Sequence, residues 1–529
     1  MNKSPSHAGR VTLVGAGPGD ADLLTLRGRA ALGEADCVLY DALVDPRVLD
    51  FAPPQALRID VGKRARAHRV PQEETNDLMV RLAQAGRRVV RLKGGDPYLF
   101  GRGAEEVAHL ASRGVPCEVV PGVTAASAAC ACAGIPLTHR RHSSAVLLMT
   151  GHLDPGKSQD ALPPAIVAAL VQAGATLCVY MGSSRLESFC SSLVQAGLPA
   201  STPAALVQWG ATPRQRTARA PLGELPAAVA RAGLGAPSLI VVGPVADLDA
   251  SENPGLDFYT RRSLFGVGVM TTRATTQSGT LTQRLLALGA DVLEAPAIAI
   301  EPAPDQDLAR VDQALFRLRD YQWLVLTSAN GVEALADRLS ELDRRAPAHG
   351  PRADARLFAG LRVAAIGDAT ARACTERLGI RPDLVPDRFV AESLAHDLLS
   401  RCGERSRFLL LRADIARPEL RETLLAAGHE VDDLTIYRTV APAHLPQHAL
   451  DALRGGGVQW VTFTSSSTVH NLVQLLGADA HLLKAIRLAS IGPITSGALK
   501  QHGLSPTVEA TRSDIDGLVH AMVEAHASA

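Results

Sequence analysis

Near the N-terminus, the residues most suited to binding a ligand are the glycines of one short loop. This loop, GAGPGD at 15–20, follows the apolar run Val11–Val14. A glycine-rich turn after a strand can hold a phosphate with its backbone N–H groups. Here, however, the spacing is G-x-G-x-G, and Pro18 removes one N–H group that a pyrophosphate would need. The pattern disfavours a nicotinamide dinucleotide and favours a ligand in van der Waals contact with the loop.

Four further apolar runs in the first half end in similar corners. The corners are KGGDP (93–97), PGVTAA (121–126), TGH (150–152) and MGSS (181–184). Amphipathic stretches rich in Ala and Leu separate the runs, an alternation typical of an α/β fold. Each corner presents backbone N–H groups to a ligand.

The second half contains an internal repeat. LVLTSANGV (324–332) is similar to VTFTSSSTV (461–469), and AAIGDATARA (364–373) is similar to ASIGPITSGA (489–498). The order and spacing agree, so we predict two similar lobes. In each unit an apolar strand runs into hydroxyl-bearing residues and then a helix, which places helix N-termini at the ligand-binding edge of an open sheet.

Other chemistries find little support in the sequence. The eight cysteines form neither a disulfide framework nor a zinc-binding pattern, so we expect reduced thiols. His139 and His142 have a spacing that suits a metal, but no third ligand candidate is nearby. We predict no metal. The second half shows no nucleophile with a neighbouring base and no Walker loop.

Length and composition limit the number of domains and the kinds of partner. A chain of 529 residues should contain three or four cores. Its formal net charge is zero, which gives no reason to expect nucleic acid as a partner. No apolar run approaches the length of about 20 residues that a membrane span needs, so we expect no membrane association and a cytoplasmic location. Residues 1–9 are predicted to be flexible, and the polar stretch 249–263 is predicted to be a linker.

The motifs of the first half, taken together, resemble the uroporphyrinogen-III C-methyltransferases of the tetrapyrrole methylase family. The resemblance covers 10–248 and rests on YDALV (40–44), VGKRARAH (61–68), VVRLKGGDPYLFGRGAEE (89–106), EVVPGVTAASAA (118–129) and AGIPLTHR (133–140). It implies two α/β lobes with S-adenosylmethionine in the cleft between them, S-adenosylhomocysteine as a product, and a homodimer formed through this half. The substrates would be small tetrapyrroles.

The resemblance also assigns cofactor contacts. These fall on Pro18, Gly94, Gly95, Asp96, Leu99, Thr124, Ala125, Met181 and Gly210. Glycines at 94 and 95 would let the backbone approach the cofactor, and Asp96 can accept hydrogen bonds from its ribose or amino group. An alternative for Asp96 is a turn-forming role before Pro97.

Two catalytic residues follow from the same resemblance, Asp41 as base and Lys63 as acid. Asp41 could equally cap a helix, and Lys63 could pair with a substrate carboxylate. The cationic segment 63–69 suits a substrate with eight carboxylates, although a solvated basic loop is the simpler alternative.

From about 264 to the end, the sequence resembles uroporphyrinogen-III synthase, which needs no cofactor. The family fold implies one lobe from about 264–302 with 437–529 and another from about 305–435. Matching positions assign Tyr437 to loss of the substrate hydroxyl, and Thr370, Ser465 and Thr495 to substrate binding. Arg412 is a candidate partner for a substrate carboxylate.

The two resemblances predict a bifunctional enzyme. It would cyclise hydroxymethylbilane to uroporphyrinogen III with inversion of ring D, then methylate C2 and C7 to give precorrin-2. One alternative is a methyltransferase fused to a non-catalytic tetrapyrrole-binding module. Another is a methylase for a later corrin intermediate, which the long agreement at 89–106 disfavours. A trifunctional sirohaem synthase would need a dehydrogenase and chelatase module, which this sequence lacks.

Overall fold

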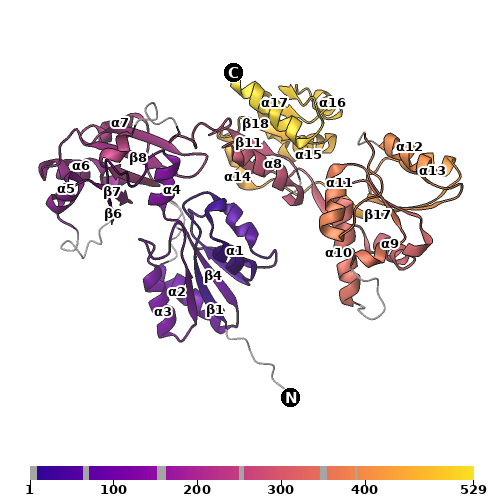
Figure 1. Cartoon of the computed structure of the whole chain (residues 1–529), viewed down its shortest axis with the longest axis horizontal. Helices are drawn as coiled ribbons and strands as arrows, with labels where there is room; N and C mark the ends of the chain where they lie inside the picture. The colour runs from indigo at the N-terminus through magenta and orange to yellow at the C-terminus, as the bar shows by residue number, and fades with distance from the viewer. Residues whose placement is uncertain are drawn as a thin grey trace, which may run out of the picture. The chain divides into compact units, whose positions relative to one another are not determined.

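The structure, a computed structural model, describes 9–62, 71–151, 162–248, 255–273, 275–345, 354–387 and 391–528, with backbone only for 275–278. The predicted flexible start lies almost entirely outside these residues. The chain divides into two compact units, the first holding most residues up to Gly268 and the second most residues from Val269 onward. The described residues form four five-stranded sheets with helices packed on them (Figure 1). The prediction of an α/β fold is confirmed.

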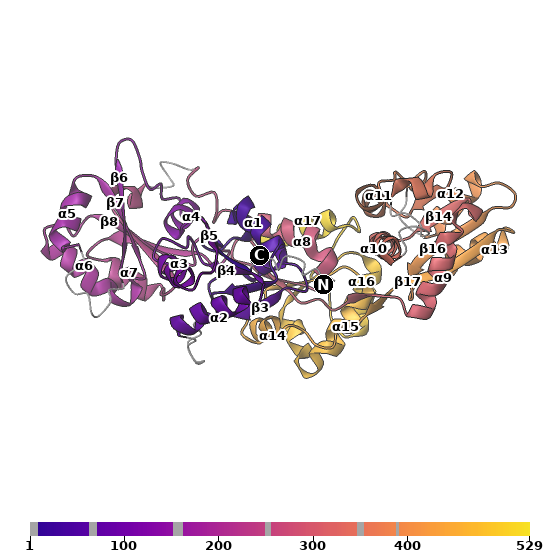
Figure 2. The ribbon, with the colours of Figure 1, turned by 90° about the horizontal axis from the view of Figure 1, so that it is seen from below.

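The first sheet is entirely parallel, with the strand order β3-β2-β4-β1-β5. Its elements are β1 (Arg10–Gly15), β2 (Cys37–Tyr40), β3 (Leu57–Asp60), β4 (Arg88–Lys93), β5 (Cys117–Val120), α1 (Leu26–Gly33), α2 (Gln72–Gln84) and α3 (Gly103–Ser112). Alternate residues of each strand face opposite layers. Val14 and Val90 pack with α1, whereas Leu13 and Val89 pack with α2 and α3 on the other face. Figures 1 and 2 show α1 and α2 on opposite sides of β4.

The second sheet is mixed, with the order β6-β7-β10-β8-β9. Its elements are β6 (Ala145–Thr150), β7 (Ala175–Tyr180), β8 (Pro203–Gln208), β9 (Arg216–Pro221), β10 (Ser238–Val242), α4 (Ala125–Cys132), α5 (Pro164–Gln172), α6 (Leu186–Gln195) and α7 (Leu225–Arg231). Ala126, Ala129 and Cys130 of α4 pack on one face of this sheet, and α5, α6 and α7 cover the other. The small residues of α4 let it lie close to the strands.

The third sheet combines segments from both ends of the second half, in the order β12-β11-β18-β19-β20. Its elements are β11 (Gly268–Thr271), β12 (Asp291–Glu294), β18 (Trp460–Phe463), β19 (Arg487–Ser490), β20 (Val508–Glu509), α8 (Thr275–Ala287), α14 (Gln447–Arg454), α15 (Ser466–Leu476), α16 (Pro493–Gln501) and α17 (Ile515–Ala527). Strands β11, β18, β19 and β20 run parallel.

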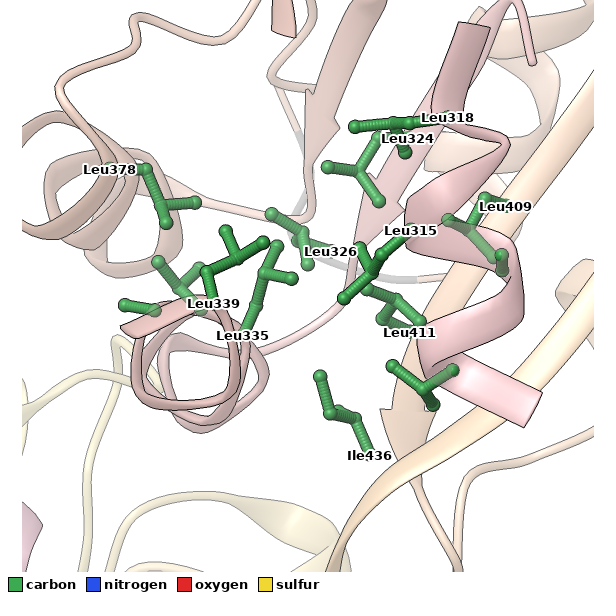
Figure 3. Close-up of a cluster of buried hydrophobic side chains, with 14 of the residues drawn as sticks. Leu315, Leu318, Leu324, Leu326, Leu335, Leu339, Leu378, Leu409, Leu411 and Ile436 are labelled. Carbon is green, nitrogen blue, oxygen red and sulfur yellow. The ribbon is translucent and has the colours of Figure 1, made fainter. Parts of the chain in front are cut away.

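The fourth sheet has the order β13-β17-β16-β14-β15. Its elements are β13 (Ala299–Pro302), β14 (Trp323–Leu326), β15 (Arg362–Ala365), β16 (Arg407–Ala413), β17 (Glu430–Val440), α9 (Asp305–Phe316), α10 (Ala329–Arg345), α11 (Asp368–Ala373), α12 (Ala391–Arg401) and α13 (Glu419–Ala426). Leucines of α9 and α10 meet leucines of β14 and β16 in one buried cluster (Figure 3). The other face packs against α12 and α13.

The predicted repeat corresponds to matching sheets. The order β17-β16-β14-β15 in one lobe matches β12-β11-β18-β19 in the other, and the repeated segments fall on β14–α10 and β18–α15, then on β15–α11 and β19–α16. Two boundaries differ from the prediction. Strand β13 pairs antiparallel with β17, which ends at Val440, so 299–302 and 437–440 belong to the sheet of the middle lobe and not to that of the chain ends.

The described part of the predicted linker, 255–263, packs against the first unit although its sequence is polar. Tyr259 is buried and packs against Ala128, Cys132 and Ala211 of the first unit. Among the helices of the described residues, none combines the length and apolar character needed to cross a bilayer.

Candidate functional site

Three loops at the carboxyl end of the first sheet are in backbone contact. Gly95 N donates to Gly17 O at 2.7 Å, and Gly17 N donates to Gly95 O at 3.3 Å. A Cβ atom on Gly122, after β5, would lie 2.2 Å from the carbonyl oxygen of Gly95. Only glycine allows this approach. These contacts hold Pro18, which follows Gly17, beside the loop that contains Asp96.

The side chain of Asp96 connects two of these loops through hydrogen bonds. Its Oδ1 accepts from Tyr98 N at 2.8 Å, and its Oδ2 accepts from Gly122 N at 3.0 Å. Leu99 N donates to Asp96 O at 3.3 Å and closes the turn. The turn-forming role of Asp96 is therefore present. A carboxylate has about four acceptor positions, so two such bonds leave capacity for a ligand.

The space beside Gly94 and Gly95 is free of described protein atoms. A Cβ atom on Gly95 would meet nothing within 4 Å, and one on Gly94 would meet only Leu43 Cβ, at 3.8 Å. Leu43 belongs to the loop that follows Asp41. The loop predicted to hold the cofactor therefore lies close to the loop predicted to hold the base, with room for an added side chain at Gly94 and Gly95.

The second sheet adds Tyr180, the last residue of β7. Its hydroxyl lies 2.5 Å from Thr124 Oγ1 and accepts from Ala126 N at 3.0 Å, which satisfies the start of α4. Its ring lies 5.0 Å from that of Phe100, in the loop after β4. Burial raises the pKa of Tyr180, so the phenol stays protonated. The sequence did not single out Tyr180, although it connects the Thr124–Ala125 corner to the first sheet.

Backbone strain concentrates in the same loops. Five described residues other than glycine have positive φ, and all five lie in the loops that follow β4, β7 and β8: Phe100, Arg102, Met181, Trp209 and Ala211. Such conformations cost free energy and persist where surrounding structure fixes them, most often at ligand sites. Met181 is a predicted cofactor contact, and Trp209 and Ala211 flank another, Gly210.

Gly210 lies against α4. A Cβ atom there would fall 2.2 Å from Ala129 Cβ, so a larger residue would push the loop away from the helix. The side chain of the buried Gln215 fixes the loop from the other side, since it accepts from Ala211 N at 2.9 Å and donates to Cys132 O at 2.9 Å. The loop is thus held in one conformation.

Asp41 lies after β2 and belongs to a network of charged side chains. Arg91 Nη2 donates to Asp41 Oδ1 at 2.6 Å. Arg91 is buried, whereas the Asp41 side chain is 32% exposed and so remains open to a ligand. Behind this pair, the fully buried Glu106 accepts from Arg91 Nε at 3.2 Å and from Lys93 Nζ at 3.0 Å. Lys63 and the cationic segment 63–69 lie outside the described residues.

Arg91, Lys93 and Glu106 were not recognised from the sequence. The available signal was the pair of basic residues at alternate positions of the apolar strand RVVRLK, which places both on the face toward α3. Burial and the neighbouring Arg91 lower the pKa of Lys93, while Glu106 and Asp41 oppose that shift. Two cations and two anions therefore balance in one enclosed network.

The synthase-like half presents serine caps in both lobes. Ser328 Oγ accepts from Gly331 N at 3.0 Å at the start of α10, and Ser465 Oγ accepts from Thr468 N at 3.3 Å at the start of α15. Thr370 and Thr495 lie in the first turns of α11 and α16 and are buried. Each lobe thus gathers helix N-termini at the carboxyl ends of its parallel strands, an arrangement that favours anions.

Tyr437 lies near the end of β17, beside one of these caps. Its hydroxyl is 2.9 Å from Ser328 Oγ, and its side chain is largely buried. Burial raises the pKa of Tyr437, although hydrogen bonds from Ser328 and Asn330 act in the opposite direction. An unperturbed tyrosine titrates near pH 10, so this phenol is protonated at neutral pH and can donate a proton.

Arg412 differs from the prediction. Its guanidinium is buried, with Nε 2.8 Å from Asp433 Oδ1, a short contact from Nη2 to Asp433 Oδ2, and Nη1 2.7 Å from Arg417 O. These bonds close the loop from Ala413 to Arg417. The geometry favours a role in holding this loop over direct contact with a substrate carboxylate. Separately, the described residues contain no group of three or more His, Cys, Asp or Glu side chains placed to hold a metal ion.

Comparison with known proteins agrees with this division of the chain. The family model for "Tetrapyrrole (Corrin/Porphyrin) Methylases" matches 10–226, and that for "Uroporphyrinogen-III synthase HemD" matches 279–520. A relative from Ruminiclostridium josui, "Porphyrin biosynthesis protein HemD", is 34% identical over 516 residues, which is 98% of both chains. The chain belongs to the family that joins these two enzymes. It is a bifunctional enzyme of tetrapyrrole biosynthesis, with a methyltransferase half and a synthase half.

Other relatives match one half. "Siroheme synthase" from Azotobacter vinelandii is 51% identical over 245 residues, which are 46% of this chain and 52% of that protein. The uroporphyrin-III C-methyl transferase of Thermus thermophilus, solved with S-adenyl homocysteine, is 41% identical, with 46% of this chain and 100% of that chain covered at a TM-score of 0.38. The uroporphyrinogen III synthase of the same organism is 20% identical, with 50% and 100% covered at a TM-score of 0.34.

Proposed function

We propose that the first half transfers methyl groups from S-adenosylmethionine to C2 and C7 of uroporphyrinogen III, giving precorrin-2 and S-adenosylhomocysteine. We further propose that the second half, without a cofactor, closes hydroxymethylbilane to uroporphyrinogen III with inversion of ring D. One observation carries the first proposal. Gly94 and Gly95, beside Asp96, leave room for a ligand, and Leu43, in the loop after Asp41, is the one described residue within 4 Å of a Cβ atom placed on Gly94.

The proposed cofactor would lie among residues of both lobes. Pro18, Gly94 and Gly95 supply close backbone approach, Asp96 accepts hydrogen bonds, and Met181 supplies apolar surface. When bound, S-adenosylmethionine supplies an electrophilic methyl group. Asp41, held by Arg91 and partly exposed, takes the proton that the macrocycle loses after methylation. The fixed loops hold the pyrrole carbon in line, and such positioning accounts for much of the rate.

In the second half, Tyr437 donates a proton to the hydroxyl that leaves hydroxymethylbilane, so that water departs. Ser465 and the N-termini of α10, α11, α15 and α16 hold the substrate carboxylates through N–H groups and hydroxyls. Thr370 and Thr495 contribute to these helix starts. Arg412 acts here through the loop that it closes.

Replacing Gly94 with alanine tests the cofactor site. The added methyl group fits the protein, because only Leu43 Cβ lies within 4 Å, but it occupies the space assigned to the cofactor. We expect the Kd for S-adenosylhomocysteine, measured by calorimetry, to rise about 10- to 100-fold, since overpacking costs about 1–3 kcal/mol. The matched control is Gly235→Ala, which also meets open space and should leave Kd unchanged. An unchanged Kd in G94A would contradict the assignment.

Methyl transfer itself is tested by incubating the full chain with uroporphyrinogen III and S-adenosylmethionine labelled in the methyl group. We expect two labelled methyl groups in the product, located on C2 and C7 by NMR. A single methyl group, or methylation at other carbons, would contradict the proposed product and favour a different tetrapyrrole methylase.

We also propose that the methyltransferase spans 10–248 and the synthase 264–529, joined by 249–263, and that the enzyme is a homodimer through its first half. Ile166 and Leu170 on the outer face of α5 are exposed although apolar, as is Val146 on the edge strand β6. Such a patch favours association. Light scattering should give twice the monomer mass, and I166E should reduce the measured mass.

A cytoplasmic location is consistent with eight free cysteines.

A further inference from the structure

The carboxylate of Glu106 is the centre of a buried network that extends beyond the Asp41–Arg91 pair. Its Oε1 accepts from Arg91 Nε at 3.2 Å, from Lys93 Nζ at 3.0 Å and from Gln72 Nε2 at 2.9 Å. Its Oε2 is buried and has no hydrogen-bond partner among the residues that the structure describes. The residue is fully buried on α3, while Arg91 and Lys93 project from β4 and Gln72 begins α2. Three elements therefore meet at one carboxylate.

The network has a balanced charge. Arg91 and Lys93 are the cations, and Asp41 and Glu106 are the anions. A buried charge without a partner is strongly unfavourable, so each member requires the others. Of these four groups, only Asp41 is substantially exposed. A change in the buried charges therefore acts on Asp41, the exposed member of the network.

Other titratable groups lie on the elements packed around Glu106. Cys117 on β5 faces it, but burial, followed by the charge of Glu106, raises the pKa of that thiol to about 11, so it is neutral. Glu105, the preceding residue, is exposed and pairs with Arg102 at 2.6 Å. His109 and Asp77 pair with each other at 3.0 Å, farther along α3 and α2.

We propose that Glu106 and Lys93 are positioning residues for methyl transfer, which fix the orientation of Asp41 through Arg91. This inference rests on the proposed function of the first half. Glu106 competes with Asp41 for Arg91 and neutralises Lys93. Arg91 consequently donates one hydrogen bond to Asp41 from Nη2 and one to Glu106 from Nε.

Substitutions of Glu106 and Lys93 should shift the pH dependence of kcat/KM in opposite directions. In Glu106→Gln an anion is lost and Arg91 acts on Asp41 alone, which favours the ionised form of the Asp41 carboxylate. In Lys93→Met a cation is lost, and the same carboxylate is easier to protonate. Because a general base works when deprotonated, the acid limb of kcat/KM should move to lower pH in E106Q and to higher pH in K93M.

The test measures methyl transfer to uroporphyrinogen III by the full chain across pH, for wild type, E106Q, K93M, E106D and the control E34Q. We expect kcat to fall about tenfold or more in E106Q and K93M, because misplacing a reacting group by about 1 Å can lower the rate about 100-fold, with the opposite limb shifts above. E106D keeps the negative charge and should have the acid limb of the wild type. E34Q alters an exposed carboxylate that pairs with Arg10 at the amino end of the same sheet, and it should change neither kcat nor the acid limb.

Synthase activity of the same chain reports folding of the second half, and calorimetric binding of S-adenosylhomocysteine reports folding of the first. If E106Q does not bind S-adenosylhomocysteine, the acid limbs of K93M and E106D are compared with that of the wild type instead. Wild type that transfers no methyl group would contradict the proposed function. Active wild type with unshifted acid limbs in E106Q and K93M would overturn the present inference alone.

Discussion

Replacing Asp41 with asparagine is expected to lower kcat for methyl transfer about 10²- to 10⁴-fold, the usual contribution of a positioned general base. The change keeps the size of the side chain and removes its ability to take a proton. Because Asp41 is partly exposed and Arg91 retains Glu106, folding should be little affected. The measurement is single-turnover methyl transfer to uroporphyrinogen III, with synthase activity recorded on the same sample.

The matched control is Asp77→Asn. Asp77 is an exposed carboxylate of the same half, paired with His109 at 3.0 Å on the outer side of α2 and α3. The D77N variant should transfer methyl groups at the wild-type rate. If D41N also retained full activity, Asp41 would be a structural residue held by Arg91, and the base would have to be sought elsewhere around the open space.

The second large effect is expected from Tyr437→Phe. Loss of the hydroxyl removes the proposed proton donor and should slow formation of uroporphyrinogen III about 100-fold. Ser328 still caps α10 through Gly331, so the free energy of unfolding should fall by only about 0.5–1.5 kcal/mol. The rate is measured by isomer-resolving chromatography after rapid mixing with hydroxymethylbilane.

Tyr321→Phe serves as the comparison for Y437F. Tyr321 is also buried in this lobe, but it precedes β14 at the opposite end of the parallel strands, where its hydroxyl donates to Asp432. Its loss should cost about 1–3 kcal/mol of stability and leave the synthase rate unchanged. Equal rates for Y437F and wild type would assign Tyr437 to packing of the cap and not to catalysis.

Much of the fold could be predicted because its signals are local. Each strand, corner and helix is contiguous in sequence, so the repeated segments at 324–332 and 461–469 indicated two similar lobes. The matching sheet orders agree with that prediction. The same locality explains why Ser465 was found as the start of a helix, a position that its hydrogen bond to Thr468 N bears out.

What could not be predicted depends on contacts between distant residues. Arg412 looked free to bind substrate because Asp433 is 21 residues away, on the neighbouring strand β17, and only strand pairing brings them together. Glu106 meets Lys93 for a similar reason, since α3 covers one face of β4. Tyr259 lies in a stretch without periodicity, and its burial depends on the cluster that receives it.

The most direct test of the central claim is to supply the purified chain with freshly prepared hydroxymethylbilane, with and without S-adenosylmethionine, and to identify the products by isomer-resolving chromatography and mass spectrometry. We predict uroporphyrinogen of type III without the cofactor and a dimethylated product with it. Type I alone without the cofactor would contradict the synthase assignment and leave the second half as a binding module. Type III that stays unmethylated with the cofactor would contradict the methyltransferase assignment.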